Sequence, residues 1–209
     1  MQGSNFIRLA RVVRDLAFHP QYIGPYFTIG PWSRQAPLEL GLPWFSLAAI
    51  RFLSQYVSKS MNVFEYGSGG STIYFARKAA SIVSTEDNSQ WLERVKAQLA
   101  ASDIDNATLQ FRPFDFHHPA GFENSDYLRS IPERAFDIIV VDGTEELIQV
   151  RPTCFQYAEK RIKPGGIIIV DDSWRYPQLR SAHHAKSVRE FRSVGPCRPG
   201  VTSTDIYFY

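Results

Sequence analysis

Two stretches of the chain, Ile138–Val141 and Ile167–Val170, consist only of isoleucine and valine. A half-exposed strand alternates apolar and polar residues, so unbroken runs predict strands covered on both faces, as in a parallel sheet. Shorter apolar runs precede them, and helical patterns separate most of the runs. We therefore expect a doubly wound, mostly parallel α/β sheet, with strands at 63–66, 81–84, 108–111, 136–141 and 166–170.

The clearest helical pattern covers residues 88–101. Asp87 and Gln90 stand three residues apart at its start, which is the spacing of a capping box. The apolar residues that share one face of this helix are Trp91, Val95 and Leu99.

The C-terminal tail has a different pattern. Residues 188–192 and 204–209 flank a turn region bounded by Gly195 and Gly200, and together they predict a closing hairpin. We see no internal repeat and no second domain.

The first 60 residues differ in character from the rest. Residues 6–18 and 44–57 have helical spacings of apolar residues, whereas 19–43 contain many prolines and glycines that break long elements. We expect residues 1–60 to form a helical and partly irregular arm, which serves as packing or as a lid over a substrate site. Residues 61–209 would form the core. The aromatic side chains of the arm also suit a contact between two copies of the chain, as a homodimer.

The composition bears on the class of protein. The net charge is only +2 and the basic residues are scattered, so no basic stripe predicts a nucleic-acid partner. Cys154 and Cys197 are too few for a disulfide framework and fit a reducing, cytoplasmic setting. No apolar run reaches the roughly 18 residues of a membrane helix, and we expect no signal peptide.

A glycine-rich turn follows the first expected strand, with the sequence Glu-Tyr-Gly-Ser-Gly-Gly-Ser from Glu65 to Ser71. Gly67 and Gly69 let the backbone turn sharply and approach a ligand, because no Cβ stands in the way. A helix that begins near Ser71 would add free N–H groups and the positive end of its dipole. Related turns bind the pyrophosphate of a dinucleotide.

Three residues around the turn favour a different ligand. Glu65 would repel a pyrophosphate but suits a cationic group, and Thr72 replaces the third glycine of the dinucleotide pattern. Glu86 ends the next expected strand, nineteen residues after Gly67. A carboxylate there can accept hydrogen bonds from both hydroxyls of a ribose. Alternatively, Glu86 only stabilises the positive end of the dipole of the helix that follows.

These residues resemble motifs of the class I (Rossmann-like) S-adenosylmethionine-dependent methyltransferases. Glu65-x-Gly67-x-Gly69 resembles the first motif, and Glu86 matches the acid after the second strand. The other matching segments, in the family's order, are Phe114-Asp115-Phe116, Phe136–Gly143 and Ile162–Asp172. Gly70-Ser71 departs from the further small residue and glycine of many members. The resemblance covers about residues 63–174 and implies a seven-stranded sheet whose last strand is antiparallel.

The resemblance implies that S-adenosylmethionine, or its product S-adenosylhomocysteine, binds at the glycine turn. Asp115 matches the family's acid on the adenine side. The residues that we expect to contact the cofactor are Glu65, Tyr66, Gly67, Ser68, Gly69, Ser71, Thr72, Glu86, Asp115, Phe116 and Asp142.

Candidates for catalysis follow the fourth and fifth expected strands, whose carboxyl ends face the ligand in open α/β sheets. We expect Asp142 and Asp172 to act as general base or to orient the acceptor. With Asp171 they resemble the Mg²⁺ site of catechol-type O-methyltransferases. Asp172 replaces that family's amide and Glu145 its lysine, so we do not expect the metal. Alternatively, Asp171 or Asp172 caps the next turn.

Other polar residues are weaker candidates. His117-His118 and His183-His184, the latter on a predicted helix, could each supply a base. Trp174–Tyr176 follow the fifth strand directly and are candidates to line the acceptor pocket. Surface charge and core packing are the simpler explanations of Arg151 and Cys154.

The sequence therefore predicts an S-adenosylmethionine-dependent methyltransferase with a small-molecule acceptor, and O-methylation is the expected chemistry. An NAD-dependent oxidoreductase on a related Rossmann fold and a noncatalytic S-adenosylmethionine-binding module are the alternatives. Transfer of an aminopropyl group from the decarboxylated cofactor is a weaker alternative. The enzymes that catalyse it need further acidic residues at the acceptor site, and we do not identify these in this chain.

Overall fold

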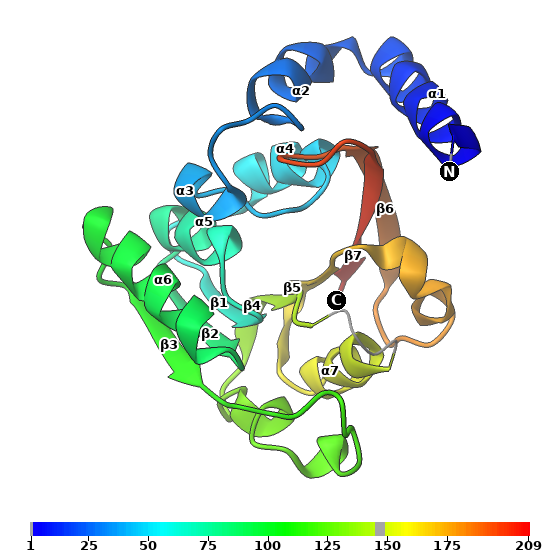
Figure 1. Cartoon of the computed structure of the whole chain (residues 1–209). Helices are drawn as coiled ribbons and strands as arrows, with labels where there is room; N and C mark the ends of the chain where they lie inside the picture. Colours follow the sequence, from blue (N-terminus) through cyan, green and yellow to red (C-terminus); the bar gives the residue numbers. More distant parts are fainter. Residues whose placement is uncertain (1, 145–148) are drawn as a thin grey trace.

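The computed structural model describes residues 2–144 and 149–209 (Figure 1). Seven strands form one sheet in the order β3-β2-β1-β4-β5-β7-β6. Neighbouring strands from β3 to β5 are parallel, whereas β7 runs antiparallel to both β5 and β6. The strands are β1 (Asn62–Tyr66), β2 (Ser81–Glu86), β3 (Ala107–Phe111), β4 (Phe136–Val141), β5 (Ile162–Val170), β6 (Ser187–Val194) and β7 (Val201–Phe208). The expected doubly wound sheet and its antiparallel last strand are confirmed.

The strand boundaries follow the apolar runs closely. The main difference is β5, which begins at Ile162 rather than Gly166 because Ile162 pairs with Phe136. The register then shifts, and regular pairing resumes between Ile138 and Ile167.

Helices cover both faces of the sheet (Figure 1). Residues of α4, α5 and α6 pack on one face, and α7 packs on the other. The helices are α1 (Gln2–Phe18), α2 (Ile23–Ile29), α3 (Pro37–Leu40), α4 (Leu47–Tyr56), α5 (Gly70–Lys78), α6 (Ser89–Ala101) and α7 (Val150–Ala158), with short 3₁₀ turns between some elements.

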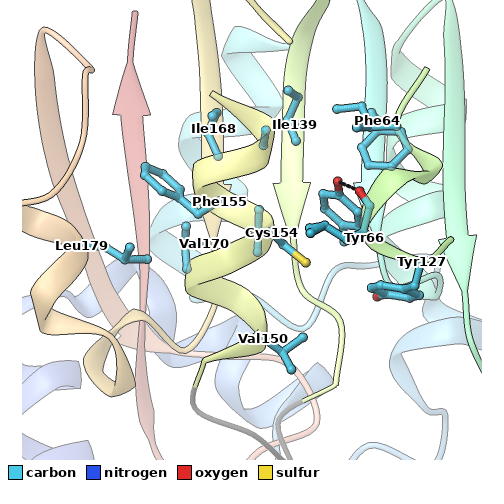
Figure 2. Packing of buried hydrophobic residues seen from close by; sticks show 14 of the residues in the cluster. Phe64, Tyr66, Tyr127, Ile139, Val150, Cys154, Phe155, Ile168, Val170 and Leu179 are labelled. Carbon is cyan, nitrogen blue, oxygen red and sulfur yellow. Dashed lines mark hydrogen bonds between the residues drawn. The ribbon is translucent and has the colours of Figure 1, made fainter. Parts of the chain in front are cut away.

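The core on the α7 side contains the end of β1 (Figure 2). Ile139 of β4 and Cys154 and Phe155 of α7 belong to this cluster. Tyr66 is fully buried there, and its hydroxyl donates a hydrogen bond to the Leu128 carbonyl at 2.7 Å. The phenol of Tyr66 therefore has a structural partner inside the protein.

The opposite face is packed against α4 and α5. Ile138 and Ile167 lie in this cluster with Leu53 and Phe75, because successive residues of a strand point to opposite faces. Both faces of β4 and β5 are thus buried, which explains why their sequences show no polar alternation.

Two local predictions are wrong. Asn88, rather than Asp87, caps α6, since its side chain accepts from the Trp91 backbone N–H at 3.0 Å. The backbone N–H of Asp87 instead donates to the Glu86 carboxylate, so the helix begins one residue later. His183-His184 lie in the non-helical segment that leads into β6, because the preceding turn ends at Arg180.

The N-terminal arm packs against the C-terminal hairpin and is joined to it by a hydrogen bond. Val12 of α1 packs with Leu47 of α4 and with Val194 of β6. Helix α4 begins at Leu47, later than expected, because Ser46 is its cap: the Ser46 hydroxyl accepts from the Ala49 N–H at 3.2 Å. The same hydroxyl donates to a β6 carbonyl, that of Phe191, at 2.8 Å.

Within the described ranges, no helix combines the length and the apolar character needed to cross a bilayer. Cys154 is buried, Cys197 is half-buried, and both are free thiols.

We predict that Ser46→Ala lowers the free energy of unfolding by about 1–2 kcal/mol, because it removes both the helix cap and the tie to β6. Urea denaturation would measure this. Ser54→Ala is the matched control, since the Ser54 hydroxyl donates to the Arg51 carbonyl of its own helix on the exposed side; we expect a change within about 0.5 kcal/mol. Equal losses of unfolding free energy in the two variants would contradict a stabilising role for the Ser46 hydrogen bonds.

Candidate functional site

The order of the strands reverses direction between β1 and β4. Because the connections leave on opposite sides of these two strands, a crevice forms outside their carboxyl ends. A cavity of about 670 Å³ opens at this place, which we call the glycine-turn cavity. Its walls come from the turn after β1, the ends of β2, β4 and β5, helices α6 and α7, and residues 36–38 and 44 of the arm.

The glycine turn is shaped by its contact with the end of β4. Gly67 has a left-handed backbone with φ of +86°, and a Cβ there would come within 2.5 Å of the Asp142 carbonyl oxygen. Only glycine fits both conditions. Gly69 differs, because a Cβ there would meet only the Trp91 ring, at 3.8 Å. Its position leaves open space on the cavity side.

The Glu86 carboxylate holds the turn from the neighbouring strand. One of its oxygens accepts from the Ser68 backbone N–H at 3.0 Å and from the Ser68 hydroxyl at 2.7 Å. The other accepts from the backbone N–H groups of Asp87 and Asn88. Glu86 lines the cavity, so an acid stands where the sequence predicted a ribose partner.

Glu65 lies beneath the turn and is fully buried. Its Oε2 accepts from the hydroxyls of Thr72 at 2.6 Å and Ser84 at 2.8 Å. The Thr72 hydroxyl also accepts from the Gly69 N–H. Burial raises the pKa of Glu65 to about 7, although hydroxyl hydrogen bonds act in the opposite direction. Its Oε1 has no hydrogen-bond partner in the described part of the chain.

The predicted cofactor residues fall into three groups. The cavity is lined by Gly67, Ser68, Gly69, Ser71, Glu86 and Asp142. Buried behind the turn are Glu65, Tyr66 and Thr72. Outside the cavity lining are Asp115 and Phe116. Asp115 is exposed and accepts from the His117 backbone N–H and the His118 ring, while Phe116 packs in the core. The structure therefore brings the first group together and leaves the last apart.

The acids after β4 and β5 meet two arginines, and we call these five residues the acid–arginine cluster. Arg151 lies 3.1 Å from the Asp142 carboxylate and donates to the Asp171 carbonyl at 2.8 Å. Arg198 donates to the Asp172 carboxylate at 2.9 Å and lies 3.9 Å from that of Asp171. Asp142 and Asp171 face the glycine-turn cavity, whereas Asp172 lines a second cavity.

The pKa values in this cluster are perturbed. Burial raises the pKa of Asp142 to about 7, while Arg151 acts to lower it and the Asp172 carboxylate to raise it further. Burial also holds the pKa of Asp171 well above its usual range, with repulsion from Asp142 and Asp172. A carboxyl that titrates near neutrality beside a cavity is suited to proton transfer.

The cluster does not fit a Mg²⁺ site. The guanidinium groups of Arg151 and Arg198 are bound among the three carboxylates and supply the positive charge that a metal would bring. No group of three metal-binding side chains was found among the described residues. The alternative that Asp172 caps the next turn is wrong, because its carboxylate makes no capping bond and instead accepts from the Thr202 hydroxyl. Glu145 lies outside the described residues.

Four residues of the site were missed by the sequence prediction. Arg151 is only 2% exposed, so its assignment to surface charge is wrong. An arginine in the first turn of α7 opposes the helix dipole, and this mismatch was the available signal. Trp91 binds the turn through its indole N–H, which donates to the Ser68 carbonyl at 2.7 Å. Trp44 and Arg198 reach the cavity from the arm and the tail, and no local pattern marks them.

The sequence matches no family model and no curated protein. Solved structures resemble it in fold. An O-methyltransferase from Bacillus cereus in complex with SAH is 18% identical, with a TM-score of 0.63 over 96% of this chain and 99% of that one.

Two other solved structures give the same result. TomG from Streptomyces achromogenes, an O-methyltransferase involved in tomaymycin synthesis and complexed with SAM, is 16% identical, with a TM-score of 0.63 over 96% of this chain and 97% of that one. An rRNA methylase from Streptococcus thermophilus is 11% identical, with a TM-score of 0.56 over 84% and 98%. The chain therefore has the class I methyltransferase fold.

We predict that Glu65→Gln stabilises the protein in a pH-dependent way. Because the pKa of Glu65 is raised from its ordinary 4.5 to about 7 in the folded state, the wild type loses stability as pH rises from about 4.5 to about 7. A glutamine can still accept from Thr72 and Ser84. We expect the variant to be more stable by about 3 kcal/mol at pH 8 and equal to the wild type near pH 4.5.

Urea denaturation across this pH range measures the difference. Glu93→Gln is the control, because Glu93 is largely exposed on α6; its difference from wild type should stay small at every pH. A Glu65→Gln variant that is less stable at pH 8 than at pH 5, relative to wild type, would contradict the burial argument.

Proposed function

We propose that this protein is an S-adenosylmethionine-dependent methyltransferase that transfers the methyl group to an oxygen of a small-molecule acceptor. One observation carries the proposal: the Gly67–Gly69 turn, the Glu86 carboxylate and the Asp142 carboxylate converge on one cavity at the point where the strand order reverses. This is the place where open α/β sheets bind their ligands.

The charge of the cavity favours a cationic cofactor over a dinucleotide. Four acids line it, namely Glu86, Asp87, Asp142 and Asp171. Of the three arginines on its wall, Arg151 and Arg198 are engaged with the aspartates, and Arg94 lies 3.7 Å from the Glu39 carboxylate. Glu86 and Asp87, at and just after the end of β2, attract a sulfonium and an ammonium group and repel a pyrophosphate, which argues against an NAD-dependent oxidoreductase.

The residues present fit S-adenosylmethionine. Gly69 leaves the space into which a Cβ would project, and the buried Glu65 Oε1 has no partner among the described residues, as an acid that serves the cationic methionine end would. Glu86 would bind the ribose. Its oxygens already accept from Ser68 and from two backbone N–H groups, so the Ser68 hydroxyl would turn aside for a ribose hydroxyl.

The cofactor, when bound, supplies a methyl group that is already activated, so the protein has to align the acceptor and take its proton. We assign Asp142 as the general base that takes the proton of the acceptor, because its pKa of about 7 matches neutral pH. Arg151 orients the Asp142 carboxylate through the 3.1 Å contact. Asp172 lies further from the turn, on the second cavity, where it would orient the acceptor.

Several further assignments belong to this proposal. Solved structures of the same fold include O-methyltransferases complexed with SAH or SAM, which supports an oxygen acceptor. Residues 1–60 would form an arm on a core of residues 61–209, since Pro37 and Trp44 supply one wall of the cavity. Two free thiols favour the cytoplasm, and the exposed Phe18 and Phe27 of the arm suit a homodimer.

We predict that the wild type binds S-adenosylhomocysteine and not NAD in isothermal titration calorimetry. Glu86→Gln should weaken S-adenosylhomocysteine binding by about tenfold or more, because a charged acceptor of ribose hydroxyls is lost. The matched control is Glu93→Gln on the exposed side of α6, which should change the affinity less than twofold. Binding of NAD alone would overturn the proposal.

We predict that Asp142→Asn lowers kcat for methyl transfer by about 10²–10⁴-fold, the usual contribution of a general base. Transfer of labelled methyl from S-adenosylmethionine to a panel of phenols would measure it. For the wild type, kcat/KM should fall about tenfold per pH unit below about pH 7, because Asp142 is then protonated. Tight cofactor binding with no turnover on any acceptor would favour a noncatalytic module instead.

A further inference from the structure

A second cavity of about 670 Å³ lies beside the glycine-turn cavity, and we call it the arginine cavity. It is enclosed by α1, the segment after β5, and the hairpin of β6 and β7. Trp44 and Arg198 line both cavities, so these two side chains form a shared wall. A molecule in the arginine cavity would lie next to the site that we propose for the methyl donor.

The lining of this cavity is strongly basic. It contains two acids, and both are paired: Asp172 accepts from Arg198 at 2.9 Å, and Glu190 lies 3.1 Å from Arg180. The arginines that line it are Arg8, Arg11, Arg175, Arg192 and Arg198. Arginines therefore outnumber acidic residues in the lining of this cavity, although the whole chain has a net charge of only +2.

Three of these arginines are available to a ligand. Arg8, Arg11 and Arg192 are exposed, and none of them forms an ion pair within residues 2–144 and 149–209. Guanidinium groups bind carboxylates and phosphates through paired, charge-assisted hydrogen bonds. Their convergence from α1 and β6 on one cavity predicts an anionic ligand.

Two tryptophans add an aromatic surface to the same cavity. Trp44 and Trp174 line it and are 49% and 59% exposed. Each indole has an arginine over one face: Arg198 lies 5.1 Å from the Trp44 ring, and Arg175 lies 4.8 Å from the Trp174 ring. Exposed indoles beside a cavity are suited to contact with a flat apolar ring.

From these observations we propose that the arginine cavity binds the methyl acceptor and that the acceptor is an aromatic small molecule carrying a carboxylate or phosphate. Its ring packs against Trp44 or Trp174, and its anionic group binds Arg8, Arg11 and Arg192. This inference rests on the proposed function, because it names the acceptor of that reaction. The cavity volume matches a small ligand, whereas a nucleic-acid strand needs a longer groove with successive stacking platforms.

The test uses 2-naphthoate and 2-naphthyl phosphate as anionic probes and 2-naphthol as the neutral analogue, titrated into the full chain at low salt. We expect both anions to bind at least tenfold more tightly than 2-naphthol. Arg192→Gln should weaken the anions by about tenfold and leave 2-naphthol unchanged. Arg189→Gln is the matched control: Arg189 is on the same strand but stacks on Phe191 and does not line the cavity.

Three results would overturn the inference: equal binding of the charged and neutral probes, equal effects of the two arginine variants, or binding of a single-stranded oligonucleotide without binding of either anion. S-adenosylhomocysteine is titrated into the same proteins to separate the two proposals. Binding of S-adenosylhomocysteine without the naphthyl anions means that only the acceptor assignment fails. Binding of the anions without S-adenosylhomocysteine means that the methyltransferase proposal fails, and the acceptor role fails with it.

Discussion

The site depends on the close approach of the ends of β1 and β4 at Gly67. The left-handed backbone of this residue and the 2.5 Å separation that a Cβ would have from the Asp142 carbonyl leave room for no side chain. Backbone hydrogen bonds fix the approach on both sides, from Gly67 N–H to the Thr85 carbonyl and from Asp142 N–H to the Tyr66 carbonyl. This contact brings the turn and the acid after β4 to one cavity, beside the acid that ends β2.

Buried charge is the second determinant of the site. Asp142, Asp171 and Asp172 would repel one another at the strand ends, and Arg151 and Arg198 hold them together. Burial and repulsion between the carboxylates raise the pKa of Asp142 and Asp171 against the effect of these arginines. Because the pKa of Asp142 is about 7, this residue is able to exchange a proton near neutral pH. The same arginines supply the positive charge that a bound Mg²⁺ would otherwise bring to these carboxylates. This distinguishes the cluster from a carboxylate site for Mg²⁺.

Under the proposed function, the two cavities would hold the methyl donor and the acceptor side by side. The glycine-turn cavity has Glu86 and Asp87 beside the turn, which suit a cation, whereas the arginine cavity is basic and suits an anion. Trp44 and Arg198 line both cavities, so donor and acceptor would lie in neighbouring sites of different charge beside the acid–arginine cluster. The N-terminal arm is part of this arrangement, since Arg8, Arg11 and Trp44 come from it.

The sequence alone determined the sheet and the glycine turn, because these depend on local periodicity and on backbone freedom. It also placed Glu86 at the end of the strand beside that turn, through its spacing along the chain. It misplaced the cap of α6, because Asp87 and Asn88 are adjacent candidates, and it misassigned Arg151, because the partners of Arg151 come from the ends of β4 and β5. The tertiary structure decided how the strand-end acids are compensated and which arginines converge. Arg8, Arg151 and the neighbouring pair Arg192 and Arg198 come from three distant parts of the chain. Only the packing of α1, α7 and the hairpin onto the sheet brings their guanidinium groups to the two cavities.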